Sequence, residues 1–207
     1  MSVEAKLWLA SALCFAVVLA LGAYVSRHAN TRFDVESVAI RGQLPRLAYV
    51  FTESGRASAL TIVGVGFILM SGFLRAGVLI PAAVLASQVV SQGAIEGLKA
   101  VFNRKRPDYW LIHNELGKSF PSGHASTAVV FYGTWAAIVA ASSLPPTLKM
   151  ILVVAFSTWA VGIVWSRLAL GAHYLSDVFG GTIFGVAWLC SILALAHHFH
   201  LHVSVRA

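Results

Sequence analysis

The chain contains 207 residues, of which 58% are hydrophobic and only 11% are charged, and its mean hydropathy is +0.78. This composition excludes an intrinsically disordered chain, because disordered chains are polar and rich in charge. It also argues against a soluble domain, whose surface would need more polar residues than this chain supplies. In so apolar a chain, the formal net charge of +7 is typical of loops beside a membrane rather than of nucleic-acid binding. The lipid bilayer is therefore an expected partner, and nucleic acid is not.

Six apolar segments approach the length of about 20 residues that is needed to cross the hydrocarbon core of a bilayer. A span in lipid has to satisfy its own backbone hydrogen bonds, so each segment is expected to be helical. The predicted fold class is all-α, a polytopic membrane helix bundle with six transmembrane helices. No repeat, low-complexity tract or linker divides the sequence, so residues 1–207 are expected to form a single integral membrane domain. The predicted spans are Leu7–Val25, Ala57–Leu74, Ala76–Ile95, Ala125–Leu144, Met150–Trp165 and Val178–Ala196.

Several residues inside or beside the spans are interpreted as structural. Gly181 and Gly185 have the GxxxG spacing that permits close contact between helices, which we expect within the bundle. Cys14 and Cys190 lie deep in apolar segments, where packing is a better interpretation than a disulfide bond or a metal site. Four histidines near the C-terminus are interpreted as a solvated tail rather than a metal-binding tract; they are His197, His198, His200 and His202.

The loops divide unequally between the two sides of the bundle. Six spans place both termini on one side, and the other side then carries the long loops 26–56 and 96–124 and the short segment 166–177. Most of the lysines and arginines lie on that second side. The loop 26–56 is either an interfacial amphipathic segment that covers a site or a solvated connector. Tyr109 and Trp110 are interpreted as anchors at the membrane interface.

The first of three polar clusters on this side follows the third span. Lys99 and Arg106 are almost two helical turns apart, so they share a face if the helix continues between them. Pro107 disfavours helical geometry in the preceding residue and ends the element. The alternative is a basic patch that touches lipid headgroups, and Arg104 and Lys105 are interpreted as that patch.

The second cluster opens the fourth span. Ser122 suits the N-cap position of a helix, and the free amides that follow it, together with the small Gly123, provide an anion site. His124 lies in the first turn, within reach of whatever those amides hold. The alternative is an ordinary helix cap with a histidine at the interface.

The third cluster enters the sixth span. His173 and Asp177 have i, i+4 spacing and lie on one helix face, close in sequence to Arg167. A carboxylate there accepts the Nδ1–H of the imidazole and leaves Nε2 as a nucleophile. The alternative is a structural hydrogen bond, since a buried aspartate needs a partner in any case.

Together the clusters supply cations, two histidines, a carboxylate and a helix N-terminus, an inventory that suits a phosphoryl group. The sequence resembles the type 2 phosphatidic acid phosphatase family, whose signature is K-x6-RP, PSGH and SR-x5-H-x3-D. The signature region covers residues 99–177. The soluble vanadium haloperoxidases share this signature, but the six spans argue against that branch. The matching residues are Lys99, Arg106, Pro107, Pro121, Ser122, Gly123, His124, Ser166, Arg167, His173 and Asp177.

The resemblance implies catalytic roles for two histidines and one aspartate. His173 would attack phosphorus and form a phosphohistidine, while Asp177 would fix its tautomer. His124 would protonate the leaving oxygen and then activate water. The phosphate-binding residues that the resemblance implies are Lys99, Arg106, Ser122, Gly123 and Arg167.

The expected function is therefore that of a metal-independent membrane lipid phosphatase, which hydrolyses a lipid phosphate monoester or diphosphate and releases inorganic phosphate. Only Asp177 among the eight acidic residues falls in the signature, so no carboxylate cage for Mg²⁺ is evident and no cofactor is expected. Phosphatidic acid, phosphatidylglycerol phosphate, isoprenyl diphosphate and lipid A phosphates all fit as amphipathic substrates. Two alternatives stay open, a lipid phosphotransferase that uses the same histidine and a non-hydrolytic phospholipid transporter. No obligate protein partner is evident.

The expected location is a bacterial inner (plasma) membrane. Bacterial members of the family typically present their site to the periplasm or the cell exterior, which implies the same for this chain. The positive-inside rule favours the opposite orientation, because the side that carries most basic residues is usually cytoplasmic.

Overall fold

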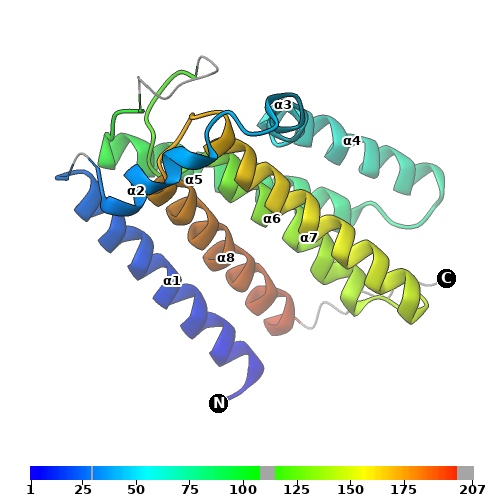
Figure 1. The fold of residues 1–207 in the computed structure, drawn as a ribbon. Helices are drawn as coiled ribbons and strands as arrows, with labels where there is room; N and C mark the ends of the chain where they lie inside the picture. Colours follow the sequence, from blue (N-terminus) through cyan, green and yellow to red (C-terminus); the bar gives the residue numbers. More distant parts are fainter. Residues whose placement is uncertain (29, 108–114, 200–207) are drawn as a thin grey trace.

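In a computed structural model the chain forms an all-helical bundle, described for residues 1–28, 30–107 and 115–199, and these residues contain no β-strand (Figure 1). Five long helices and one bent pair of helices dominate it. Two short elements, α2 and the 3₁₀ helix η1, follow the first long helix. In chain order the elements are α1 (Val3–Val25), α2 (Arg32–Glu36), η1 (Ser37–Ile40), α3 (Pro45–Ser54), α4 (Ala57–Phe73), α5 (Leu79–Phe102), α6 (Gly123–Ala141), α7 (Pro146–Ala169) and α8 (Leu175–His198).

The predicted six spans correspond to these helices, with one modification. Helices α1, α5, α6, α7 and α8 are each long and apolar enough to cross a membrane. The predicted second span is α4, which has 17 residues and qualifies only together with α3, from which it bends by 55°. Among the described residues the bundle thus has five straight candidate spans and a sixth that is broken. An all-α membrane bundle is confirmed, but residues 45–54 are helical where a loop was expected.

Both termini of the helical bundle lie at one end, and the signature residues lie at the other (Figure 1). Helix α1 packs along α8, and their distal ends are joined by Glu4 and His198, whose Oε1 and Nδ1 are 3.1 Å apart. At the opposite end the hydroxyl of Ser26 donates to the carbonyl of Phe102, 3.0 Å away. The last turns of α5 and α7 and the first turns of α6 and α8 therefore meet at one end, which we call the signature end.

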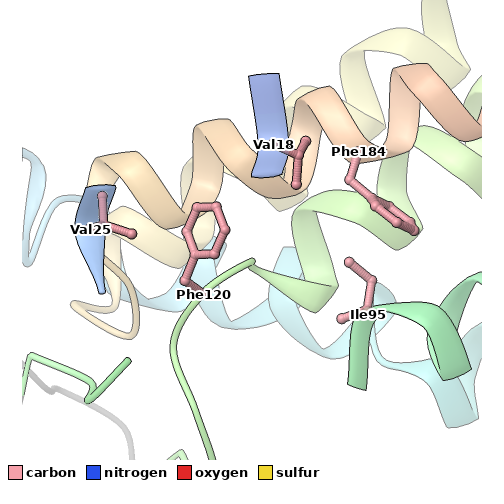
Figure 2. Close-up of a cluster of buried hydrophobic side chains, with 5 residues drawn as sticks. All are labelled: Val18, Val25, Ile95, Phe120 and Phe184. Atoms are coloured by element: carbon pink, nitrogen blue, oxygen red, sulfur yellow. The ribbon is translucent and has the colours of Figure 1, made fainter. Parts of the chain in front are cut away.

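The chain before α6 is fixed by a buried aromatic ring. Figure 2 shows Phe120 among side chains from three helices, Val18 and Val25 of α1, Ile95 of α5 and Phe184 of α8. Its ring occupies space that Gly180 leaves open, since a Cβ atom there would lie 2.4 Å from the ring. This packing sets the position of Ser122, two residues later.

Close contact between α6 and α8 depends on glycines, as the GxxxG spacing predicted. A Cβ atom on Gly181 would lie 2.3 Å from the carbonyl oxygen of Ser122, and one on Gly185 would lie 2.6 Å from Cβ of Val129. The expected packing role of these glycines is confirmed. Cys14 and Cys190 are free thiols, which agrees with their interpretation as packing residues.

The first long loop is built as a cover rather than as a solvated connector. Thr31 and Asp34 form a capping box at the start of α2, and this short helix contacts α8. Phe33 is exposed on the outer face, whereas Asp34 is fully buried on the inner face. Of the two alternatives for the loop 26–56, the structure therefore supports the segment that covers the signature end.

Candidate active site

Lys99 and Arg106 both lie at the signature end, but Lys99 is in a helix and Arg106 is in the non-helical segment that follows it. Helix α5 ends at Phe102, because Asn103 adopts a left-handed conformation with φ of 51°, so the helix does not continue to Arg106. Lys99 is in the last turn, and its Nζ lies 3.6 Å from where a Cβ atom on Gly123 would stand. That Nζ also pairs with Oε1 of Glu96 at 2.7 Å. Lys99 is thus directed from the last turn of α5 at the start of α6, whereas Arg106 lies beyond the end of α5.

Arg106 holds one ring nitrogen of His173. Its Nη1 lies 3.2 Å from Nε2 of His173 and also donates to the carbonyl of Ala172 at 2.9 Å. Its Nη2 donates to the carbonyl of Leu116 at 3.1 Å. A guanidinium has only donors, so Nε2 of His173 accepts this hydrogen bond and carries the lone pair. The proton of the neutral ring is then on Nδ1.

The other ring nitrogen of His173 faces Asp177, but a serine lies between them. Nδ1 is 3.5 Å from Oδ2 of Asp177 and 3.3 Å from Oγ of Ser119. Ser119 Oγ in turn donates to that same Oδ2 at 2.5 Å. The predicted histidine–aspartate pair therefore exists as a three-member relay, and Ser119 is a member that sequence reasoning missed. The two residues do not share a helix face as expected, because α8 begins at Leu175 and His173 lies in the bend before it.

The environment of His173 favours the neutral ring. Burial lowers the pKa of His173 well below its usual value of 6.5, and the positive charges of Arg106, Arg167 and Lys99 lower it further, while Glu115 opposes them. A neutral imidazole with its lone pair on Nε2 is the nucleophilic form.

The start of α6 has the predicted cap, with one difference. The hydroxyl of Ser122 accepts from the amide of Ala125 at 3.5 Å, but the amide of Ser122 itself donates to the backbone carbonyl of Asp177 at 3.0 Å. Of the two amides expected to bind phosphate, this contact uses that of Ser122. The amide of Gly123 is at the first helical position, where no intrahelical acceptor exists. His124 follows, and among the described residues its buried Nε2 has no hydrogen-bond partner.

Arg167 is fully buried and is held by two groups that sequence reasoning missed. Its Nη1 donates to the hydroxyl of Thr52, in α3, and its Nη2 pairs with Oε1 of Glu115 at 2.6 Å. Burial alone raises the pKa of Glu115, but the charge and hydrogen bond of Arg167 outweigh it and bring that pKa below 4.5. Glu115 is thus an ionised carboxylate paired with the buried guanidinium of Arg167.

Arg104 does not contact lipid headgroups, so that interpretation is wrong. Its guanidinium is buried and pairs with both Asp34 and Asp177, whereas its neighbour Lys105 is exposed. A short run of basic residues carries no periodic signal that separates an inward side chain from an outward one. Tyr109 and Trp110 lie outside the described residues, as do His200 and His202.

The signature end brings together the eleven residues that match the family signature, at the ends of four helices and the segments between them. Within the described part of the chain, no group of three or more histidine, cysteine, aspartate or glutamate side chains is arranged to hold a metal ion. The charges nearest His173 are mainly positive, since Lys99, Arg106 and Arg167 all act on this ring. Such a set suits an anion with several oxygens.

Fold and site together define a polytopic membrane protein with a cluster of buried charged residues at one end of its helix bundle. Comparison with known families agrees with this class: the PAP2 superfamily matches residues 76–200. The chain belongs to the PAP2 superfamily. The predicted resemblance is thereby confirmed.

Individual relatives are phosphatases that act on lipids. Phosphatidylglycerophosphatase B of Haemophilus influenzae is 27% identical over 199 residues, which cover 72% of this chain and 79% of that protein. Lipid A 1-phosphatase of Rhizobium etli is 30% identical over 126 residues, or 56% of this chain, and the matched part spans only 50% of the relative. The crystal structure of a transmembrane PAP2-type phosphatidylglycerolphosphate phosphatase from Bacillus subtilis superposes with a TM-score of 0.77 at 25% identity, covering 92% of this chain and 96% of that one.

Proposed function

We propose that this protein is a membrane lipid phosphatase that hydrolyses a lipid phosphate monoester or diphosphate through a phosphohistidine on His173. One observation carries the proposal: Arg106 donates to Nε2 of His173, while Nδ1 faces Ser119 and Asp177. This contact supports the proposal, because a neutral nitrogen with its lone pair lies beside a cation that is suited to phosphate. The names of the relatives support hydrolysis of a phosphoric monoester on a lipid.

The substrate phosphate would be held by the three cations and one helix N-terminus. Lys99 and Arg106 neutralise the charge on its oxygens, and the guanidinium of Arg167 donates two hydrogen bonds to one side of it. The amide of Gly123 adds a donor where negative charge develops on the phosphoryl group. Glu115 gives up its place on Arg167 when the phosphate enters, because both anions need the same guanidinium.

The reaction follows as two displacements at phosphorus. The lone pair on Nε2 of His173 forms an N–P bond while the bond from phosphorus to the lipid oxygen breaks, and His124, which enters this step protonated, gives that oxygen its proton. Neutral His124 then takes a proton from water, whose oxygen attacks phosphorus and breaks the N–P bond. Inorganic phosphate leaves, and both histidines return to their starting states. Asp177 stabilises the positive charge that the ring of His173 carries in the intermediate.

We also propose that turnover needs no metal ion or other cofactor. The charge that Mg²⁺ neutralises in many phosphoryl-transfer enzymes is met here by Lys99, Arg106 and Arg167. The carboxylates nearest the reacting centre, Glu115 and Asp177, are already paired with arginines. Phosphate release that persists in excess EDTA is the expected result, and a strict requirement for added Mg²⁺ would contradict this part of the proposal.

The substrates we propose are amphipathic, because the site lies at the ends of membrane-spanning helices. Free phosphate released from phosphatidic acid, phosphatidylglycerol phosphate, an isoprenyl diphosphate and lipid A would be measured with the protein purified in detergent. Release from at least one of them, lost in His173→Ala, supports the phosphatase. Transfer of the phosphoryl group to a second lipid without free phosphate would indicate a phosphotransferase. Movement of intact phospholipid across vesicles without hydrolysis would indicate a transporter.

We propose that the signature end faces the periplasm or cell exterior of a bacterial inner membrane. Two positions allow a test of this orientation, since Gln43 is exposed beside the signature end and Arg75 is exposed between α4 and α5 at the other end. Single cysteines at these two positions would be treated in intact cells with a membrane-impermeant thiol reagent. Labelling of Gln43→Cys but not of Arg75→Cys is expected, and the reverse pattern would place the site in the cytoplasm.

A further inference from the structure

Arg104 is the centre of a buried ionic cluster behind the proposed nucleophile. Its Nη1 donates to Oδ1 of Asp177 at 2.6 Å and to the hydroxyl of Ser176 at 2.7 Å. Its Nη2 donates to Oδ2 of Asp34 at 3.0 Å. The guanidinium carbon also lies 4.2 Å from the centre of the Tyr174 ring. All of these groups are buried, so the charges of the cluster are met mainly by one another and by these hydrogen bonds rather than by bulk water.

Asp34 is the second carboxylate of the cluster and comes from a distant part of the chain. It lies in α2, in the loop that covers the signature end, and is fully buried. Its Oδ1 accepts from the amide of Ser176 at 2.9 Å and from the hydroxyl of Ser176 at 2.7 Å. Its Oδ2 accepts from the amide of Thr31 at 3.0 Å in addition to Arg104. Burial raises the pKa of Asp34, but these hydrogen bonds and the charge of Arg104 bring it below 3.8.

The two oxygens of Asp177 have separate tasks. Oδ1 is taken by Arg104, whereas Oδ2 accepts from Ser119 and from the amide of Tyr174 and faces the ring of His173. Contacts to both oxygens prevent rotation of the carboxylate. The orientation of the histidine ring is therefore set from Arg104 through Asp177.

We propose that Asp34 and Arg104 form a positioning pair for the nucleophile: Arg104 orients Asp177 towards His173, and Asp34 offsets the charge of Arg104. Without Asp34, the cluster behind the histidine would be a neutral pair of one guanidinium and one carboxylate. With Asp34, the cluster keeps one net negative charge. When Nε2 of His173 bonds to phosphorus, the ring becomes positively charged, and that net charge stabilises it. This inference rests on the proposed phosphatase function and deepens it.

The first test is Asp34→Asn, which keeps the shape of the side chain and removes its charge. We expect kcat for phosphate release to fall by about 10- to 100-fold, as for other partners that orient a reacting group. The KM and the inhibition constant of inorganic phosphate should stay unchanged, because Lys99, Arg106 and Arg167 are untouched. Glu36→Gln is the matched control, since it makes the same chemical change on the same helix at an exposed carboxylate and should leave kcat unchanged.

A pH profile distinguishes this role from a merely structural one. Loss of the Asp34 charge removes a negative group behind His173, so its pKa falls and the acid limb of kcat moves to lower pH. The double variant Asp34→Asn with Arg104→Gln removes both charges and restores one net negative charge on the cluster. Its acid limb should return towards that of the parent protein, although kcat stays low because Asp177 is no longer oriented. Within the described part of the chain, the charged and titratable groups that face His173 are Lys99 on α5, Arg106 after α5, Glu115 before α6, His124 on α6, Arg167 on α7 and Asp177 on α8.

The outcomes separate this inference from the proposed function. If the parent protein releases no phosphate from any lipid phosphate, the proposed function fails. If the parent protein is active, the inference is overturned by parent-like kcat in folded Asp34→Asn. It is equally overturned by a fall in kcat with no shift of the acid limb. If Asp34→Asn does not fold, the double variant decides: parent-like kcat overturns the inference, and low kcat with an unchanged phosphate inhibition constant supports it. If the double variant also fails to fold, Arg104→Lys decides: a parent-like kcat overturns the inference, and a low kcat with an unchanged phosphate inhibition constant supports it.

Discussion

The two ends of the bundle carry charged residues of different kinds. At the signature end, the side chains of Arg104 and Asp177 are 4% and 0% exposed. At the opposite end, the paired side chains of His198 and Glu4 are 60% and 30% exposed. Both sets lie near a membrane boundary, and by composition alone they look alike. Charges that meet headgroups stay hydrated, whereas buried charges persist only where the protein compensates them. Buried and mutually paired charges therefore distinguish the signature end from the opposite end.

The largest effect is expected for His173→Ala at the signature end. Removing the nucleophile should reduce phosphate release by about 1,000-fold or more and abolish the phosphoenzyme. The measurement is trapping of labelled phosphoenzyme on brief exposure to substrate, with lipid binding as the check that the site is intact. Near-normal activity in this variant would show that another residue attacks phosphorus.

Arg167→Lys tests whether the ammonium group of lysine can replace the buried guanidinium of Arg167, which donates in two directions at once. Lysine keeps the charge but loses the simultaneous contacts with Thr52 and Glu115, so we expect kcat/KM to fall by about 100-fold, equal to about 2.7 kcal/mol. Arg32→Lys is the matched control, because Arg32 is exposed and pairs only with Glu36 among the described ion pairs. Equal effects of the two substitutions would contradict a special role for the buried guanidinium.

The pH dependence tests the electrostatics of His173. Because its pKa is lowered from 6.5, the ring stays neutral as the pH falls through 6.5, and kcat should hold down to a more acidic limb. The same shift affects stability, since the unfolded chain takes up this proton first. The stability that His173 contributes is present above pH 6.5 and is lost as the pH falls from 6.5 through the lower folded pKa. A loss of kcat on the acid side of the profile that begins at or above pH 6.5 would contradict the lowered pKa of His173.

Glu115→Gln should have a smaller effect, in the opposite direction. The amide no longer competes for Arg167 as an anion, so inorganic phosphate should inhibit about 3- to 10-fold more strongly, a difference of about 0.6–1.4 kcal/mol. The inhibition constant is measured by phosphate titration at saturating and subsaturating lipid. Weaker inhibition in Glu115→Gln would mean that this carboxylate supports phosphate binding by holding Arg167 in place.

The smallest effect is expected at the opposite end. Glu4→Gln removes an exposed ion pair with His198, and such pairs contribute about 0–1 kcal/mol. Phosphate release and the midpoint of thermal unfolding should both stay at the values of the parent protein. A loss of activity here would show that the two ends of the bundle are coupled, and the contrast between them would then fail.

Much of the architecture was predictable because it depends on local chemistry. The length and apolarity of a segment determine whether it crosses lipid, so the spans were found within a few residues. Gly181 and Gly185 were recognised because close helix contact needs small side chains. The bend between α3 and α4 was missed, since it depends on packing against α7 and α6 at Gly55, where a Cβ atom would lie 2.6 Å from Ile163.

The site residues divide in the same way. His173 and Asp177 were found from their i, i+4 spacing, although His173 lies before α8 rather than on it. Lys99 and Arg106 were found because their spacing matched a family signature. Asp34 was not found, although it contacts the amide of a residue 142 positions away. No periodicity or spacing rule relates two residues so far apart. Glu115 was missed for a similar reason, because it meets Arg167 only when the segment before α6 folds back.

The amino-acid sequence by itself determined that this protein lies in a membrane, that it is helical and which residue types gather at one membrane boundary. Hydropathy and short-range spacing, on which these conclusions rest, are properties of the chain. Only the tertiary structure decided which charges are buried and which partner each one takes. Arg104 shows the difference: two residues from Arg106, it looks like part of the same basic run, yet it faces Asp34 and Asp177. The physical reason is that the energy of a charge depends on its surroundings, and those surroundings come from helices that are distant in sequence.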